Sequence, residues 1–246
     1  MRLLDEIGRY LLLLKQVFKR PENERIYLRR IIFEMDRLGL DSLGIVVIIS
    51  VFMGAVLCIQ MAFNIEHPLI PLYTIGLSVR ESIVLEFSPT IISLILAGKV
   101  GSRIASEIGT MRITEQIDAL EIMGINPAAF LIFPKIVATV FINPILIIIS
   151  MFLGVFGGWL AGVTTGLVSS EVYIYGIQSF FIPFNIFYAL IKTAVFAFLI
   201  SSISSYFGYY TKGGALEVGT SSTNAVVYSS IMIIVFNLIL TQLLLT

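Results

Sequence analysis

The longest uncharged stretch of the sequence, residues 136–170, restricts what this chain can fold into more than any other feature. Soluble domains carry about a quarter of their residues as charged side chains, so they rarely leave such a gap. Across the whole chain only 13% of the residues are charged and 57% are hydrophobic. We therefore predict an all-α polytopic membrane protein that leaves no room for a separate soluble catalytic domain.

Apolar runs of about 20 residues can cross a bilayer as helices, and this chain contains about five of them. A straight helix over residues 136–170 would be roughly 50 Å long. We therefore expect one long helix there that is bent or tilted. Residues 172–185 are aromatic and broken by Gly176 and Pro183, so they are expected to be interfacial or a loop; a sixth span is the alternative. The expected spans are residues 43–63, 82–98, 136–170, 186–207 and 225–246.

The N-terminal segment is basic and amphipathic. Apolar residues recur at helical spacing over residues 3–18 and again over 28–38, on either side of the motif "RPENE". We expect interfacial helices within residues 1–40 and a transmembrane domain over residues 41–246; packing on a partner is the alternative. Nine of the sixteen Lys and Arg residues precede residue 40, which predicts a cytoplasmic N-terminus. The segment 99–135 carries four more and is expected on the same side.

Small residues repeat every four positions in "LAGKVGSRIASEIGT", which begins at Leu96. Residues four apart are neighbours on a helix, so this spacing predicts a face that another helix can approach closely. A charged column, Lys99, Arg103 and Glu107, lies beside that face. A second small-residue row occurs later in the chain. The candidate helix-packing residues are Gly98, Gly101, Ser102, Ala105, Gly154, Gly158 and Gly162.

A short amphipathic helix over about residues 107–124 is expected next, with Glu115, Asp118 and Glu121 along one side. Gly124 is typical of a helix stop and Pro127 of a helix breaker. The acidic side could face water. It could equally receive force from a cytoplasmic partner, because the helix is held on a short connection between two spans.

Polar residues inside the expected spans are candidates for a lipid cavity: Gln60, Asn64, Glu86 and Pro89. A carboxylate in a span normally lines a cavity, pairs or is protonated, so Glu86 is either a cavity residue or a structural hydrogen-bonding group. Pro89 removes the helical donor to the carbonyl of Leu85 and should bend the helix. Gln60 and Asn64 could meet a polar headgroup or bond neighbouring helices, and Lys192 could extend to the interface.

Motifs for enzymatic chemistry are missing from the sequence. There is no Walker A motif, no HExxH and no Cys/His cluster with metal-ligand spacing. We therefore expect no catalytic residue, no metal and no cofactor in this chain. The basic and aromatic residues show no nucleic-acid-binding pattern. Two classes of function remain as candidates: a subunit of a transporter, and a stand-alone channel or secondary transporter.

The motif "AGKVGSRIASEIGTMRITEQIDALEIMGINP" resembles the signature of the MlaE/YrbE permease family, the membrane subunits of ABC lipid transporters. The motifs "GAVLCIQ", "LEFSPTI", "LIKTAVFAF" and "GTSSTNAVVYSS" extend the resemblance from about residue 40 to the end. At four charged positions of the family pattern this chain has a different residue. Leu85, Lys99 and Asn224 stand where arginine is common, and Asn237 stands where aspartate is frequent.

This resemblance implies a homodimeric permease of the bacterial inner membrane that moves phospholipids or related lipids. It implies two ATPase subunits that bind ATP and Mg in separate chains, an MCE-domain protein on the outer side, and a STAS-domain protein as a further partner. A lipid cavity would lie between the two permease copies. The residues expected to couple to the ATPase are Glu107, Gly109, Met111, Arg112, Thr114, Glu115, Gln116, Asp118 and Glu121.

Overall fold

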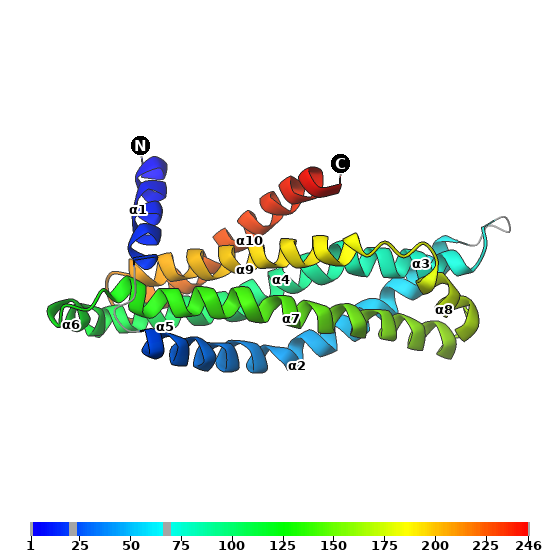
Figure 1. Cartoon of the computed structure of the whole chain (residues 1–246), viewed down its shortest axis with the longest axis horizontal. Coiled ribbons are helices and arrows are strands. Elements are labelled where there is room, and N and C mark those ends of the chain that lie inside the picture. Colours follow the sequence, from blue (N-terminus) through cyan, green and yellow to red (C-terminus); the bar gives the residue numbers. More distant parts are fainter. Residues whose placement is uncertain (1, 20–23, 66–69, 246) are drawn as a thin grey trace. The chain divides into compact units, whose positions relative to one another are not determined.

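The computed structural model describes residues 2–19, 24–65 and 70–245, and every regular element within them is a helix (Figure 1). Five helical stretches of the described residues are long and apolar enough to span a membrane. They are Arg25–Asn64, Tyr73–Ile113, Pro127–Thr164, Phe184–Tyr209 and Ala215–Leu245. The predicted all-α membrane fold with five spans is confirmed.

The N-terminal region forms α1 (Arg2–Val17) and the start of α2 (Glu24–Asn64). Leu13 and Val17 of α1 are buried, whereas Leu11 and Leu12 are exposed, so α1 keeps one apolar side uncovered. The helix predicted over residues 28–38 and the span predicted over 43–63 are one continuous helix, α2. Charged residues sustain a helix as well as apolar ones, so the change in hydropathy near residue 41 is no break in the backbone. The proposed boundary between an interfacial segment and a transmembrane domain falls inside α2 and stays a prediction.

The second span is longer than predicted, because the helix continues without a break on both sides of residues 82–98. It comprises α3 (Tyr73–Ser82), η1 (Ile83–Ile91), α4 (Ile92–Leu96), η2 (Ala97–Gly101) and α5 (Ser102–Ile113). Both η1 and η2 are π-helical. Pro89 lies within η1, where the wider turn accommodates a residue that cannot donate a backbone hydrogen bond.

The uncharged stretch forms the single long helix expected, α7 (Pro127–Thr164). Asn126 precedes it, and its side-chain oxygen accepts from the backbone N–H of Ala129 at 3.3 Å. Pro127 is then the first helical residue, where a missing N–H costs nothing. Gly166, with φ of +70°, follows the end of the helix.

The C-terminal part of the chain forms three helices. α8 (Ser170–Gln178) has only 9 residues, too few to span a membrane, so the segment expected to be interfacial or a loop contains a short helix. Its N-cap Ser169 accepts a bond from the N–H of Val172 at 3.4 Å. α9 (Phe184–Tyr209) matches its prediction closely. α10 (Ala215–Leu245) begins at Ala215 rather than at residue 225.

These helices form two compact units, and α2, α4, α7 and α9 contribute to both. The first unit consists of Met1–Ser42, Leu94–Asn143 and Ala194–Thr246; the second consists of Leu43–Ser93 and Pro144–Thr193.

The core of the second unit depends on glycines that bring α2 and α7 into backbone contact. A Cβ at Gly54 would collide with the backbone oxygen of Gly154, and one at Gly157 with that of Val51. The GxxxGxxxG row is therefore a packing surface. Gly154 faces Ile83 and Gly162 faces Cys58. Gly158 lies against the Tyr173 hydroxyl.

Candidate functional site

The predicted coupling helix is two helices in the structure. α5 ends at Ile113, and α6 (Gln116–Ile122) starts after a turn at Thr114 and Glu115. Glu115 has φ of +59°, a left-handed conformation that is uncommon outside glycine. The sequence motif gave no sign of this turn, since Glu is a good helix former. Gly124, with φ of +77°, ends the segment as predicted.

α6 follows α5 within the first unit (Figure 1), and side-chain contacts hold one side of it in place. Ile117 is fully buried beneath it. Arg112 of α5 forms an ion pair with Asp118 at 2.6 Å. The hydroxyl of Tyr209, at the end of α9, donates to Glu121 at 3.4 Å. Two of the three predicted acidic side chains therefore stabilise the segment itself.

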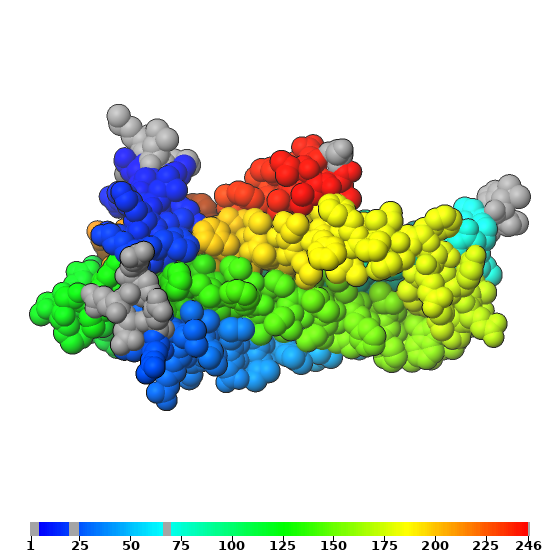
Figure 2. Space-filling view, viewed as in Figure 1, coloured from blue at the N-terminus to red at the C-terminus, as the bar shows by residue number. Residues whose placement is uncertain are grey.

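The tip of α6 lies at the surface of the molecule (Figure 2) and is uncovered and apolar. Ile122 is 88% exposed and Met123 is 64% exposed. Thr114, Glu115 and Gln116 are also exposed, at the turn. Met111 is half-buried, and Gly109 is buried against Thr211 and Val218. An exposed apolar tip on an anchored helix is the feature that sequence reasoning missed, because periodicity identifies faces but not which face is left uncovered.

The charged column of η2 and α5 pairs with α2 and stays partly exposed. The Lys99 ammonium donates to the backbone oxygen of Asp41. Arg103 bonds the Asp41 carboxylate at 2.5 Å and the Arg37 carbonyl at 3.1 Å. Glu107 accepts from Arg37 at 3.5 Å. The column thus holds the coupling segment to the N-terminal part of α2.

Glu107 also belongs to a buried ion network. Lys135 of α7 is 2% exposed, and its ammonium lies 3.0 Å from Glu107 and 2.6 Å from Glu34 of α2. Glu34 is 9% exposed. The Glu107 carboxylate is thus paired with α2 and α7, and its predicted role in ATPase coupling stays a prediction. It links the coupling segment to two other helices of the first unit.

The small-residue face of η2 and α5 packs against α9 and α10. A Cβ at Gly101 would meet the Ser204 side chain, and Ala105 lies against Gly208. Ser222 of α10 donates to the Ser102 carbonyl at 2.9 Å. Gly98, however, has open space where a Cβ would be.

The second unit places Glu86 beside Lys192, which is fully buried on α9. The two charged groups are 2.8 Å apart, and Lys192 also donates to the Leu85 carbonyl at 3.2 Å. This is the carbonyl that Pro89 cannot serve in an α-helix. Thr90 donates to Glu86 at 2.9 Å. The Glu86 side chain is 44% exposed, so it is both a structural partner and available at the surface of this unit.

The two ends of this pair should respond unequally to mutation. Glu86→Leu strands a fully buried ammonium and should cost about 3 kcal/mol of unfolding free energy. Lys192→Met leaves a half-exposed carboxylate that Thr90 still serves, and should cost about 1 kcal/mol. Thermal unfolding of the purified protein in detergent measures both. The double variant should be more stable than Glu86→Leu alone; equal loss in all three would contradict the assigned pairing.

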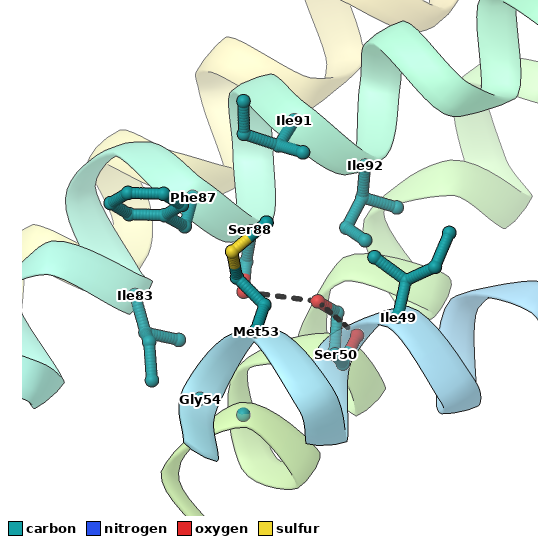
Figure 3. A pocket seen from close by; sticks show the side chains of 11 residues that line it. Ile49, Ser50, Met53, Gly54, Ile83, Phe87, Ser88, Ile91 and Ile92 are labelled. Atoms are coloured by element: carbon teal, nitrogen blue, oxygen red, sulfur yellow. Dashed lines mark hydrogen bonds between the residues drawn. The ribbon is translucent and has the colours of Figure 1, made fainter. Parts of the chain in front are cut away.

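Within the part of the chain that the structure describes, the remaining polar candidates, Gln60 and Asn64, form no hydrogen bond with the Glu86–Lys192 pair. Gln60 and Asn64 are exposed near the end of α2, one helical turn from each other. A small cavity of the second unit contains three hydrogen-bonded serines (Figure 3): Ser50 and Ser150 are 2.8 Å apart, and Ser150 and Ser88 3.0 Å. It has room for about one water molecule, so it is no lipid cavity.

Arg80 is a structural residue that the sequence did not single out. It is 4% exposed on α3 and donates to the carbonyls of Ile177, Ser179 and Phe180 at the end of α8. A cation there satisfies the last carbonyls of the helix and complements its dipole. Phe180 is held in a left-handed conformation with φ of +51°.

Comparison with known proteins identifies the family. The family model described as Permease MlaE matches residues 31–243. A probable ABC transporter permease protein of Rickettsia felis is 38% identical over 89% of this chain and 84% of its own length. One of Rickettsia bellii is 36% identical over 98% of this chain and 93% of its own. The intermembrane phospholipid transport system permease protein MlaE of Haemophilus influenzae is 31% identical over 85% and 80%. The chain belongs to the MlaE permease family.

Proposed function

We propose that this chain is the membrane subunit of an ABC transporter that moves phospholipids between membranes. The names of its relatives support an ABC permease and, for the Haemophilus protein, phospholipid as the transported molecule. ATP and Mg are bound by a separate ATPase chain in this proposal, and this chain supplies the membrane path.

The observation that carries the proposal is the anchored segment with its uncovered tip. Ile122 and Met123 offer an apolar contact to a partner. The opposite side is held by Ile117 and by the Arg112–Asp118 pair, and the charged column of α5 bonds to α2. A push on the tip is therefore transmitted into α5 and α2. A helix that only faced water would need no such anchoring.

The distribution of positive charge supports a proposed orientation in the membrane. Lys and Arg concentrate before residue 40 and between Lys99 and Lys135, so both regions face the cytoplasm by the positive-inside rule. With five spans, the C-terminus lies outside, and α8 with its neighbouring loop also lies on the outer side. The membrane is the bacterial inner membrane.

The poorly buried last helix supports a homodimer. In α9, 61% of the most apolar window is buried within the chain, but in α10 only 11% is. A second copy of α10 would cover this surface, and a lipid cavity would lie between the two copies. We propose an MCE-domain protein on the outer side and a STAS-domain protein as a further partner.

Replacing Ile122 by Asp should reduce co-purification of the ATPase subunit at least tenfold. The charge would have to be buried in an apolar interface, at a cost of a few kcal/mol. The measurement is the ratio of ATPase to permease after affinity purification of the complex encoded with its genomic neighbours.

The matched control is Ile70→Asp, which places the same charge on an exposed isoleucine of the outer side. It should leave the ratio unchanged. If Ile70→Asp released the ATPase and Ile122→Asp did not, the orientation would be reversed. Unchanged ATPase binding in both variants, with transport activity retained, would favour a stand-alone channel or carrier.

A further inference from the structure

A groove of about 280 Å³ in the first unit has no role in the proposed coupling. It lies where α9 ends and α10 begins, with α1 along one side. It combines aromatic rings with charges of both signs. The lining residues that carry the argument are Glu6, Tyr206, Tyr210, Lys212, Glu217 and Asn224.

Helical spacing brings these side chains together. Glu217, Ser221 and Asn224 follow one another at intervals of four and three residues, so they share one face of α10. Tyr206 and Tyr210 lie one turn apart at the end of α9, with ring centroids separated by 5.1 Å. The hydroxyl of Tyr10 shares a hydrogen bond of 2.8 Å with Ser202, which fixes α1 beside α9 and places Glu6 at the groove.

Internal hydrogen bonds hold the groove in shape. Ser221 donates to the Phe207 carbonyl at 2.6 Å, and Thr211 bonds Ser221 at 2.9 Å. Glu217 accepts from the backbone N–H of Gly214 at 2.9 Å, which positions its carboxylate at the rim. The floor and one charged wall are therefore preorganised, and little ordering is required when a ligand binds.

The location and the charges together indicate the ligand. Two spans end here, so the groove lies at the depth of the lipid headgroups. Glu6 and Glu217 supply two carboxylates and Lys212 one ammonium, an arrangement that complements a zwitterion better than a purely anionic headgroup. The aromatic rings also favour a bound cation. The volume is below the ~300–1,000 Å³ of pockets that enclose whole drug-sized ligands, and so suits a headgroup alone.

We propose that this groove binds the headgroup of a zwitterionic, ammonium-bearing phospholipid from the membrane leaflet in which the groove lies. The ammonium lies between the carboxylates of Glu6 and Glu217, and the phosphate faces Lys212. The acyl chains extend along the uncovered apolar side of α1. The site is separate from the cavity between permease copies and does not depend on the transported lipid.

Native mass spectrometry of the full chain in detergent, titrated with short-chain phosphatidylethanolamine or phosphatidylglycerol, tests the proposal. We expect the ethanolamine lipid to bind about fivefold more tightly, the scale of one charge-assisted contact. Glu6→Gln should remove most of this preference. Asp5→Asn, the neighbouring carboxylate outside the groove, should keep it, and both variants should unfold at the wild-type temperature.

Three outcomes would overturn the proposal. Equal binding of both lipids would remove the headgroup preference. Equal losses in Glu6→Gln and Asp5→Asn would indicate diffuse surface charge and no local site. Binding of soluble phosphoethanolamine as tight as that of the lipid would show that the acyl chains contribute nothing and that the ligand is not a membrane lipid.

Discussion

Lys135→Met should lower the free energy of unfolding by about 3 kcal/mol, since removing one partner of a buried ion pair leaves an uncompensated charge. The Glu34 carboxylate would lose a partner at 2.6 Å, and its second oxygen already has no hydrogen-bond partner among the described residues. Glu107 would keep only the longer contact to Arg37. Chemical denaturation in detergent, followed by circular dichroism, measures the loss.

Two comparisons separate this mechanism from simple loss of packing. The double variant Glu34→Gln/Lys135→Met contains no stranded charge at Glu34 and should recover most of the lost stability. Arg37→Gln removes a contact whose arginine is 39% exposed and should cost less than about 1 kcal/mol. A double variant no more stable than Lys135→Met would disprove the pairing.

The network also gives Glu107 a second role that the same variants test. Because Lys135 and Arg37 connect Glu107 to α7 and α2, motion of the coupling segment is shared by three helices. The recovered double variant keeps the fold but loosens this connection. If the network transmits force, ATP hydrolysis by the assembled complex should become less dependent on lipid transport in that variant.

Hydropathy predicted the spans well, because crossing the bilayer requires an apolar run of about 20 residues in each of them. It did not predict where the helices begin and end. α2 and α10 both extend beyond their apolar runs. The start of α10 is rich in Ser, Thr and Gly and lies outside the predicted span of residues 225–246. It is helical because Ser222 bonds α5 and Val218 covers Gly109. Such tertiary contacts override local preference.

The charged partners could not be derived from one sequence. Lys135 and Glu34 are 101 positions apart, and Lys192 and Glu86 are 106 apart. Periodicity shows which residues share a face of one helix, but not which helix covers that face. Glu86 and Lys192 were recognised as costly charges in apolar spans; only the folded chain shows that each is the partner of the other.

Gly54→Ala should have the largest effect of any single methyl group added to this protein. The new Cβ would overlap the backbone oxygen and carbonyl carbon of Gly154, and backbone atoms cannot rotate away as a side chain can. α2 and α7 would have to separate along the second unit, which would open the contacts at Gly157 and at the three serines. Overpacking typically costs 1–3 kcal/mol, and we expect about 3 kcal/mol or complete loss of folded protein.

Gly98→Ala is the matched control, because it adds the same methyl group to a helical glycine that has open space around it. Alanine favours a helix over glycine by up to about 1 kcal/mol, so this variant should be neutral or slightly more stable. Yield of monodisperse protein and the unfolding temperature in detergent report both changes. If the two substitutions had equal effects, the close approach of α2 and α7 would be wrong, and the GxxxGxxxG row would have to pack elsewhere.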